Sequence, residues 1–93
     1  MTIQSFRCSE TEALYDGKRV RRWMTIEIVA MRKLAMLHRA ANLTDLLVPP
    51  GNRLEALKHD RRGQHSIRIN GQWRICFVWT AAGPARVEIV DYH

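Results

Sequence analysis

Hydrophobic residues in the first half of the chain recur at steps of three and four, which is the period of an α-helix. The repeat predicts a helix over about residues 25–41 with an apolar face. At about 100° per residue, a second apolar stripe lies roughly opposite to the first. One stripe should pack on a sheet, and the other should be covered by the first helix or by a partner chain. The first stripe comprises Trp23, Ile26, Ala30, Leu34, Leu37 and Ala41, and the second comprises Met24, Ile28, Met31 and Ala35.

Two shorter elements precede this helix. Residues 3–7 alternate weakly between apolar and polar positions and predict a short first strand. Ser9 and Glu12 fit a capping box with Ser9 as the N-cap, so a short helix should begin there. It should end near Gly17, because glycine accepts the left-handed conformation that closes many helices. Residues 17–22 then form a basic connector.

The hydrophobic period changes to two in the second half of the chain, which indicates strands. Residues 42–47 predict a capped single turn, and residues 48–52 predict a loop, because the two prolines there cannot continue a helix. The clearest strands are residues 66–69 and 73–79, residues 87–90 form the last strand, and residues 54–57 are a shorter candidate. We therefore expect an α+β fold of order β-α-α-β-β-β, in a single domain spanning residues 1–93.

An Asn-Gly pair that begins at Asn70 marks a hairpin between the two clearest strands, and its register decides which side chains are buried. A two-residue loop would pair Ile67 with Arg74 and place this arginine on the isoleucine face. A three-residue loop pairs Ile67 with Ile75 and leaves Arg74 beside Arg68 on the opposite face. Burial of an unpaired guanidinium costs more than one bulged residue. We predict the three-residue or bulged turn, with the arginine pair away from the helices and a phosphate relieving its repulsion.

The charge of the chain points to polyanionic partners. The formal net charge is +6 at pH 7. Nucleic acid is the commonest partner of such a chain, while a membrane surface and an acidic protein are alternatives. No apolar run reaches the ~18 residues of a membrane span, and the N-terminus lacks the apolar segment of a secretory signal. We therefore expect a cytoplasmic protein without membrane contact.

The sequence does not fit common metal or nucleophile motifs. Cys8 and Cys76 form no CxxC pair and are expected as reduced thiols. The histidines show neither H-x-H nor H-x-x-x-H spacing. Ser66 lies in no nucleophile-elbow pattern, and no glycine-rich phosphate loop is present. We expect no metal and no cofactor.

Two polar clusters contain groups suited to RNA chemistry. Residues 58–62 read Lys-His-Asp-Arg-Arg, which is either a phosphate-binding patch or a solvated loop. Asp91, Tyr92 and His93 follow the last predicted strand directly and should be held against the sheet, unless they are simply a polar terminus. Cleavage of RNA by its own 2′-hydroxyl needs a proton acceptor, a cation for the phosphorane charge and a proton donor. Histidine suits the proton transfers, and Lys and Arg suit the phosphate.

Three blocks of the sequence, taken together and in this order, resemble the HigB-type toxins of bacterial toxin–antitoxin pairs. They are residues 49–58 (PPGNRLEALK), residues 64–77 with the run Gln-Trp-Arg-Ile-Cys-Phe, and residues 87–93 (VEIVDYH). The resemblance covers residues 3–93. It implies a RelE-like fold, in which two N-terminal helices pack on a small twisted, mainly antiparallel sheet.

The same resemblance implies an activity and its partners. The toxins of this family are endoribonucleases that cut messenger RNA in the 30S A site of the ribosome and so halt translation. A cognate HigA-like antitoxin with a helix-turn-helix domain neutralises the toxin and binds operator DNA, so the toxin meets DNA only through its partner. Attack by the 2′-hydroxyl does not require a metal.

Site residues follow from the resemblance motif by motif. The catalytic lysine of the family matches Lys58, the arginine of its W-R-I motif matches Arg74, and its carboxy-terminal D-Y-H matches Asp91, Tyr92 and His93. We assign RNA binding to four further arginines of these blocks and of the charged cluster, namely Arg53, Arg61, Arg62 and Arg68.

Each catalytic residue has an expected role. His93 would exchange a proton with the 2′-hydroxyl or with the leaving 5′-oxygen, and Arg74 and Lys58 would hold the scissile phosphate. Tyr92 would stack on or orient a nucleotide, and Asp91 would fix His93 or a nearby cation. The sequence leaves the identity of the general base open.

Two positions depart from the family pattern. Glu55 stands where some members have a histidine, and His59 follows the matched lysine where glycine is common.

Two other functions also fit the chain. It could be a non-catalytic module that binds RNA or an acidic partner, or an interaction protein that acts within the antitoxin complex. For the last, the stripe of Met24, Ile28 and Met31 is the candidate surface.

Overall fold

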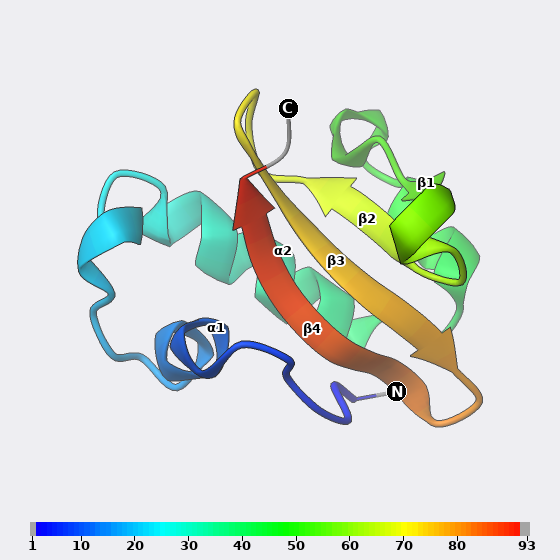
Figure 1. Ribbon diagram of the computed structural model, residues 1–93, viewed down its shortest axis with the longest axis horizontal. Helices are drawn as coiled ribbons and strands as arrows, with labels where there is room; N and C mark the ends of the chain where they lie inside the picture. Colours follow the sequence, from blue (N-terminus) through cyan, green and yellow to red (C-terminus); the bar gives the residue numbers. More distant parts are fainter. Residues whose placement is uncertain (1, 92–93) are drawn as a thin grey trace.

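Residues 2–91, which the computed structural model describes, form two helices and a four-stranded antiparallel sheet (Figure 1). The strands lie in the sheet in sequence order, and α2 crosses one face, behind the sheet in Figure 1. This arrangement confirms the predicted α+β class. The elements are α1 (Ser9–Tyr15), α2 (Glu27–Arg39), β1 (Glu55–Ala56), β2 (His65–Arg68), β3 (Trp73–Thr80) and β4 (Gly83–Asp91), with the 3-10 turns η1 (Arg21–Trp23), η2 (Leu43–Leu47), η3 (Pro50–Asn52) and η4 (His59–Arg61).

The hydrophobic core lies between α2 and the sheet. Trp23 precedes α2, Leu34 and Leu37 lie on it, and all three are fully buried, as the first apolar stripe predicts. They belong to one cluster with Ile75 and Phe77 of β3. Each such side chain contributes about 1.5–3 kcal/mol when it leaves water. This packing holds α2 on one face of the sheet and leaves the other face for polar groups.

The second apolar stripe of α2 is partly exposed. Met31 is half-buried against the core, whereas Met24 is 48% exposed and Ile28 is 75% exposed. The first helix therefore does not cover these two residues, and this part of the expectation is wrong. Large apolar side chains that remain in water at adjacent helical turns are typical of a surface that binds another chain.

Residues 3–7 do not form the predicted first strand, so the observed order is α-α-β-β-β-β. The segment still runs beside β4, where Phe6 forms a single parallel bridge with Val87. The N–H of Arg7 also donates to the carbonyl of Val87 (3.0 Å). In this stretch β4 contains one residue more than β3. The resulting bulge disturbs the edge of β4, and a longer ladder does not form.

Helix capping differs from the prediction at α1 and agrees with it at η2. Cys8, not Ser9, is the N-cap of α1 and makes no side-chain hydrogen bond as a cap. The helix ends close to Gly17, which has a φ of +90°, as predicted. The predicted turn at η2 is closed by a capping box in which Asn42 and Asp45 each accept from the other's backbone N–H.

The hairpin between β2 and β3 has the predicted three-residue register. Ile67 pairs with Ile75, and Arg68 pairs with Arg74. The side-chain Oδ1 of Asn70 accepts hydrogen bonds from two backbone N–H groups at the end of the loop (2.9 and 2.8 Å). Both isoleucines are fully buried in the core. The two arginines consequently lie on the face that points away from α2.

Candidate active site

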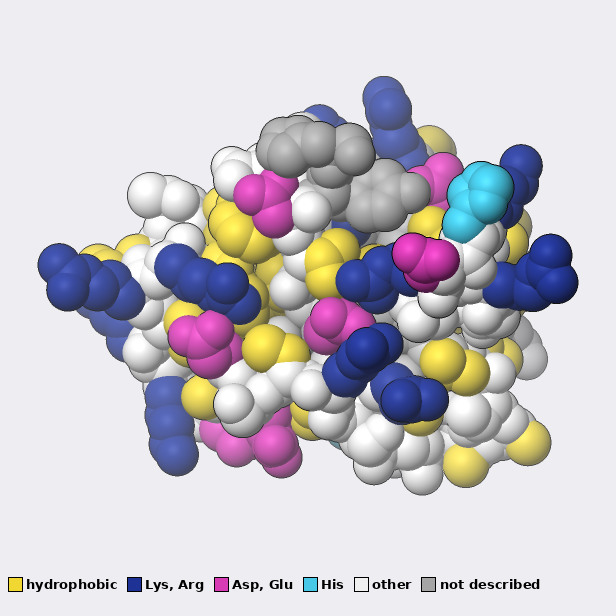
Figure 2. Space-filling model, viewed as in Figure 1, with side chains coloured by type: hydrophobic (Ala, Val, Ile, Leu, Met, Phe, Trp, Pro, Cys, Tyr) yellow, Lys and Arg dark blue, Asp and Glu magenta, His cyan; other side chains and the backbone are white. Residues whose placement is uncertain are grey.

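The sheet face that points away from α2, called the open face below, carries most of the polar groups of the strands. Two neighbouring rows of cross-strand partners lie on it: Arg68, Arg74 and Val90 in one row, and Glu55, Ser66, Cys76 and Glu88 in the next. Figure 2 shows Lys and Arg side chains (dark blue) distributed over this face, with Asp and Glu (magenta) between them. The open face therefore combines fixed cations with carboxylates.

Arg74 is the central cation of the open face and is held by neighbouring oxygen atoms. Its side chain is buried, with the residue 8% exposed. Nε donates to Oγ of Ser66 (2.8 Å), and Nη2 donates to the carbonyl of Arg53 (2.7 Å). These bonds orient the guanidinium before any ligand arrives. A cation fixed in this way stabilises a developing negative charge with little reorganisation.

Glu55 supplies the counter-charge to Arg74. Its Oε1 lies 3.5 Å from Nη2 of Arg74, and the Glu55 side chain is 48% exposed. The repulsion between Arg74 and Arg68 is therefore partly offset by a carboxylate of the chain itself. The contact also brings Glu55, one of the two departures from the family pattern, into the site.

The backbone conformation of Arg53 allows the carbonyl of this loop residue to bond with Arg74. Arg53 follows η3 with a φ of +46° and a ψ of 53°, a left-handed conformation that turns its carbonyl toward the guanidinium. The side chain of Arg53 is exposed, so it remains accessible for the predicted RNA binding. Non-glycine residues in this conformation are uncommon and gather at functional sites.

Asn52 anchors the loop that carries Arg53. It is fully buried, and its Nδ2 donates to the carbonyls of Leu46 (3.1 Å) and Val48 (3.4 Å). Its Oδ1 accepts from Nζ of Lys33 on α2. Burial, followed by the positive charges of neighbouring arginines, lowers the pKa of Lys33. The asparagine thus ties helix, turn and loop together beneath the site.

Replacement of Asn52 by alanine should destabilise the protein by about 1–3 kcal/mol, because it leaves buried carbonyl groups without their donor. Urea denaturation followed by circular dichroism measures the change in the free energy of unfolding. Thr44→Ala, at an exposed position of η2, is the matched control and should change it by less than about 0.5 kcal/mol. Equal effects of the two substitutions would contradict the anchoring role.

The charged cluster at residues 58–62 lies in and around η4, and all of its residues except Arg61 are exposed. Lys58 is exposed two residues after the end of β1, three positions beyond Glu55. Within residues 2–91, its side chain forms neither a hydrogen bond nor an ion pair. His59 is exposed and has a φ of +57°, and Arg62 is exposed. Lys58 and Arg62 are therefore accessible to a phosphate.

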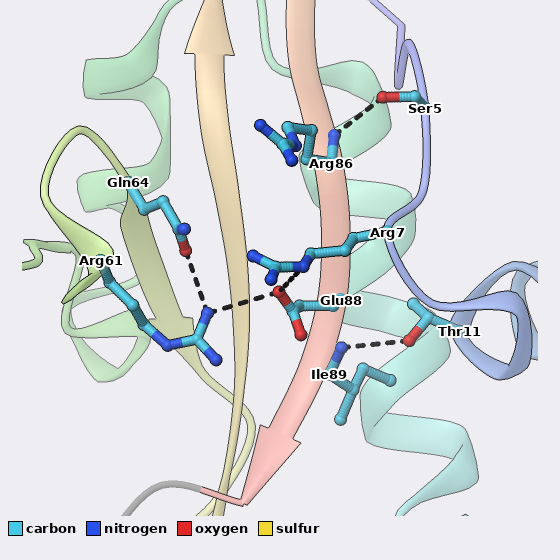
Figure 3. A network of polar contacts seen from close by, with 8 residues as sticks. All are labelled: Ser5, Arg7, Thr11, Arg61, Gln64, Arg86, Glu88 and Ile89. Atoms are coloured by element: carbon cyan, nitrogen blue, oxygen red, sulfur yellow. Dashed lines mark hydrogen bonds and ion pairs between the residues drawn. The ribbon is translucent and has the colours of Figure 1, made fainter.

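Arg61, unlike Arg62 beside it, turns back onto the open face. Its Nη1 lies 3.3 Å from Oε2 of Glu88 and donates to Oε1 of Gln64 (3.1 Å), as Figure 3 shows. The same Glu88 oxygen lies 3.6 Å from Nε of Arg7. A single carboxylate on β4 thus holds two arginines from distant parts of the chain, an arrangement that the sequence did not indicate.

The last described residue, Asp91, lies at the end of β4 and pairs with Trp73. It is exposed, and its Oδ2 accepts from Nε2 of Gln72 (3.1 Å). Tyr92 and His93, which carry the predicted stacking and proton-transfer roles, lie outside the described residues. The contact of Asp91 with His93 stays a prediction.

Cys76 lies inside the site but has the character of a structural residue. It is fully buried in the same row as Glu88, next to the row of Arg74. Burial raises the pKa of its thiol, and the nearby Arg61 opposes that shift only in part. A thiol that stays protonated is a poor nucleophile. Both Cys76 and Cys8 are free cysteines.

Residues 2–91 contain no group of three His, Cys, Asp or Glu side chains able to hold a metal ion, and no pocket. No helix in this part of the chain is long and apolar enough to cross a membrane.

Comparison with known proteins places the chain in a family. The profile of the HigB-like toxins, described as RelE-like toxin of type II toxin–antitoxin system HigB, matches residues 4–93. Toxin HigB-1 of Vibrio cholerae serotype O1 is 38% identical over 90 residues, which span 95% of this chain and 94% of that protein. An uncharacterized protein of Haemophilus influenzae is 41% identical over 49 residues, 53% of this chain and 48% of the other. The chain therefore belongs to the HigB-like family of RelE-like toxins of type II toxin–antitoxin systems.

Proposed function

We propose that the chain is an endoribonuclease that cuts messenger RNA in the ribosomal A site, and that this cleavage causes its toxicity. The position of Arg74 supports the proposal best. Its guanidinium is held by Ser66 and Arg53, and its partner on β4 is Val90, one residue before Asp91. The strand that leads into the carboxy-terminal D-Y-H motif therefore passes beside a fixed cation, while Asp91 itself pairs with Trp73 and its side chain lies on the helix face. That neighbourhood is what phosphoryl transfer with proton exchange needs.

In the proposed reaction the 2′-hydroxyl oxygen attacks the neighbouring phosphorus and gives up its proton to a base. The bond from phosphorus to the 5′-oxygen breaks, and this oxygen takes a proton. The products are a 2′,3′-cyclic phosphate and a 5′-hydroxyl. Arg74 and Lys58 hold the phosphate oxygens and stabilise their charge. His93 exchanges a proton with the 2′-hydroxyl or the leaving oxygen, Tyr92 stacks on a nucleotide, and Asp91 orients His93.

Glu55 gives the site a second group that accepts protons. Its half-exposed carboxylate stands beside Arg74, where the 2′-hydroxyl of a bound nucleotide would arrive. A carboxylate in this position can take that proton while His93 protonates the leaving oxygen. Parallel pH profiles of the cleavage rate for Glu55→Gln and His93→Ala test Glu55 as the base and His93 as the acid. Each variant should lose the part of the pH dependence that its missing group causes.

The ribosome is the proposed source of the remaining binding energy. The open face has no pocket within residues 2–91, so it cannot enclose a strand of RNA. A message held in the A site is already positioned, which reduces the entropic cost of bringing phosphate and cations together. We therefore propose that free RNA is cut far more slowly than RNA on ribosomes.

Inducible expression, with and without the neighbouring reading frame, tests the function. The toxin alone should arrest growth and create new message 5′ ends within codons, and co-expression of the antitoxin should remove both effects. His93→Ala is the catalytic control. Growth arrest without new 5′ ends would instead favour a non-catalytic binding module.

The exposed part of the second α2 stripe supports a surface for the cognate antitoxin. Met24 and Ile28 are apolar and exposed, and the cationic Arg32 lies exposed one turn further along α2. The complementary partner is an antitoxin segment with apolar and acidic side chains, and we assign it to a HigA-like helix-turn-helix protein. This surface lies on the helix side of the sheet, away from Arg74.

Ile28→Glu is expected to weaken antitoxin binding by about 10–100-fold, because burial of an isoleucine contributes about 1.5–3 kcal/mol. Titration calorimetry with the purified antitoxin measures the affinity, and message cleavage should be unchanged. Val48→Glu is the control, since Val48 is similarly exposed (69%) in a different part of the surface. Undiminished affinity of Ile28→Glu would exclude this surface.

A further inference from the structure

Arg86 occupies a backbone position that an arginine rarely takes. It lies in β4, where this strand has one residue more than β3 between two cross-strand pairs. Its φ is +54°, in the left-handed region, and its N–H donates to Oγ of Ser5 (2.9 Å). Bulges of this kind re-aim a side chain and are frequent beside active sites. Glycine or asparagine would fit the conformation with less strain, so the arginine side chain needs another explanation.

The re-aimed side chain joins two further arginines on the open face. Figure 3 shows Arg7, Arg61 and Arg86 on the same side of the sheet, with Arg7 and Arg61 at Glu88 and Arg86 beyond Arg7. Glu88 is 15% exposed and contacts Arg7 and Arg61, whose side chains are 53% and 33% exposed. The cations outnumber the carboxylate, and Arg7 and Arg86 remain accessible to solvent. Glu88 therefore orients part of a positive patch without neutralising it.

The patch lies next to the row that contains Arg74. On β4, Glu88 precedes Val90, the partner of Arg74, by two residues. Two residues of a strand advance about 7 Å, and both positions point to the open face. An extended RNA strand whose scissile phosphate rests on Arg74 would place a neighbouring phosphate over this patch. The alternative ligand, an acidic protein segment, does not require a second cation cluster at this spacing from Arg74.

We infer that Arg7, Arg61 and Arg86 form a second phosphate subsite, which holds the backbone of the message next to the cleaved linkage. The inference rests on the proposed nuclease function and adds the path of the substrate strand to it. The subsite positions the message and takes no part in proton transfer. It accepts any base, because it contacts the backbone and not the base edges.

Single-turnover cleavage on programmed ribosomes tests the subsite. One message has natural linkages, and in others a neutral methylphosphonate replaces a single linkage next to the cut, on one side or the other. Arg86→Asn keeps a residue suited to positive φ. Arg7→Gln removes the second accessible charge, and Arg39→Gln on α2 is the control, as an exposed arginine behind the sheet. Melting temperatures verify that the variants fold.

Arg86→Asn and Arg7→Gln should each slow cleavage of the natural message by about fivefold to tenfold, the loss expected for one charge-assisted contact at a partly exposed site. One of the neutral linkages should slow the wild-type toxin similarly and cause no further loss in Arg86→Asn. If the arginine variants slowed cleavage equally on every message, including those with a neutral linkage, the arginines would contact ribosomal RNA instead. That result would overturn the inference. Unchanged rates would overturn it as well. Failure of the wild type to cut the natural message would instead refute the nuclease function.

Discussion

A message with 2′-deoxyribose at the nucleotide before the cut is expected to stay intact on ribosomes that contain the toxin. The substitution removes the attacking oxygen, so cleavage at that position should fall by more than about 10³-fold, while neighbouring ribose positions remain unaffected. Primer extension on A-site-programmed ribosomes measures the effect. Efficient cleavage of the deoxy message would rule out 2′-hydroxyl attack.

The same assay should show a loss of about 10²–10⁴-fold for His93→Ala, the usual contribution of a general acid or base. His59→Asn is the matched control. It removes an exposed imidazole next to Lys58 and accepts the observed φ of +57°. His59→Asn should keep most of the activity. If it lost as much activity as His93→Ala, the imidazole assignment would have to change.

Loss of the Arg74 guanidinium should also have a large effect on cleavage. Arg74→Ala is expected to reduce single-turnover cleavage by about 10²–10³-fold, the range for removal of one pre-oriented donor to a developing charge. It should also destabilise the protein by about 1–3 kcal/mol, because Oγ of Ser66 and the carbonyl of Arg53 lose their donor.

Arg74→Lys is a second variant that keeps the prediction testable if Arg74→Ala does not fold. Lysine keeps the charge, but a single ammonium cannot bond both oxygens in the fork geometry of a guanidinium. We expect a folded protein with activity between those of the wild type and Arg74→Ala. Urea titration and cleavage rates measured on the same preparation separate stability from catalysis. A folded Arg74→Ala with wild-type rates would remove the basis of the proposed function.

The parts of the fold that depend on local periodicity could be predicted from the sequence. The stripe from Trp23 to Leu37 is buried against the sheet, and the three-residue register of the hairpin follows from the alternation of Ile67, Ile75 and their neighbours. The capping box predicted Ser9 as the N-cap of the first helix, but the N-cap is Cys8. The strand expected at residues 3–7 does not form, because β4 contains a bulge beside this segment. The bulge arises from the pairing of β4 with β3, which residues 3–7 do not reveal.

The candidate site was predictable in its residue types and less so in its contacts. Alternation and motif placed Arg74 on the open face, and its pairing with Arg68 follows from the register. Its contact with Glu55 depends on the pairing of β1 with β2, which no local pattern specifies. The attraction of Arg61 to Glu88, 27 positions away, likewise requires the assembled sheet. Such contacts join segments that are distant in sequence and become visible only in the fold.

The extended segment beside β4 has a consequence for self-association. β4 is one of the two edge strands of the sheet, and an uncovered edge strand of nine residues would be a template for strands of other molecules. Gln4 and Arg7 use the carbonyls of Pro84 and Val87 for hydrogen bonds, which occupies part of this rim. Removal of residues 2–7 should therefore promote aggregation or strand exchange between copies, even where the core between α2 and the sheet remains intact.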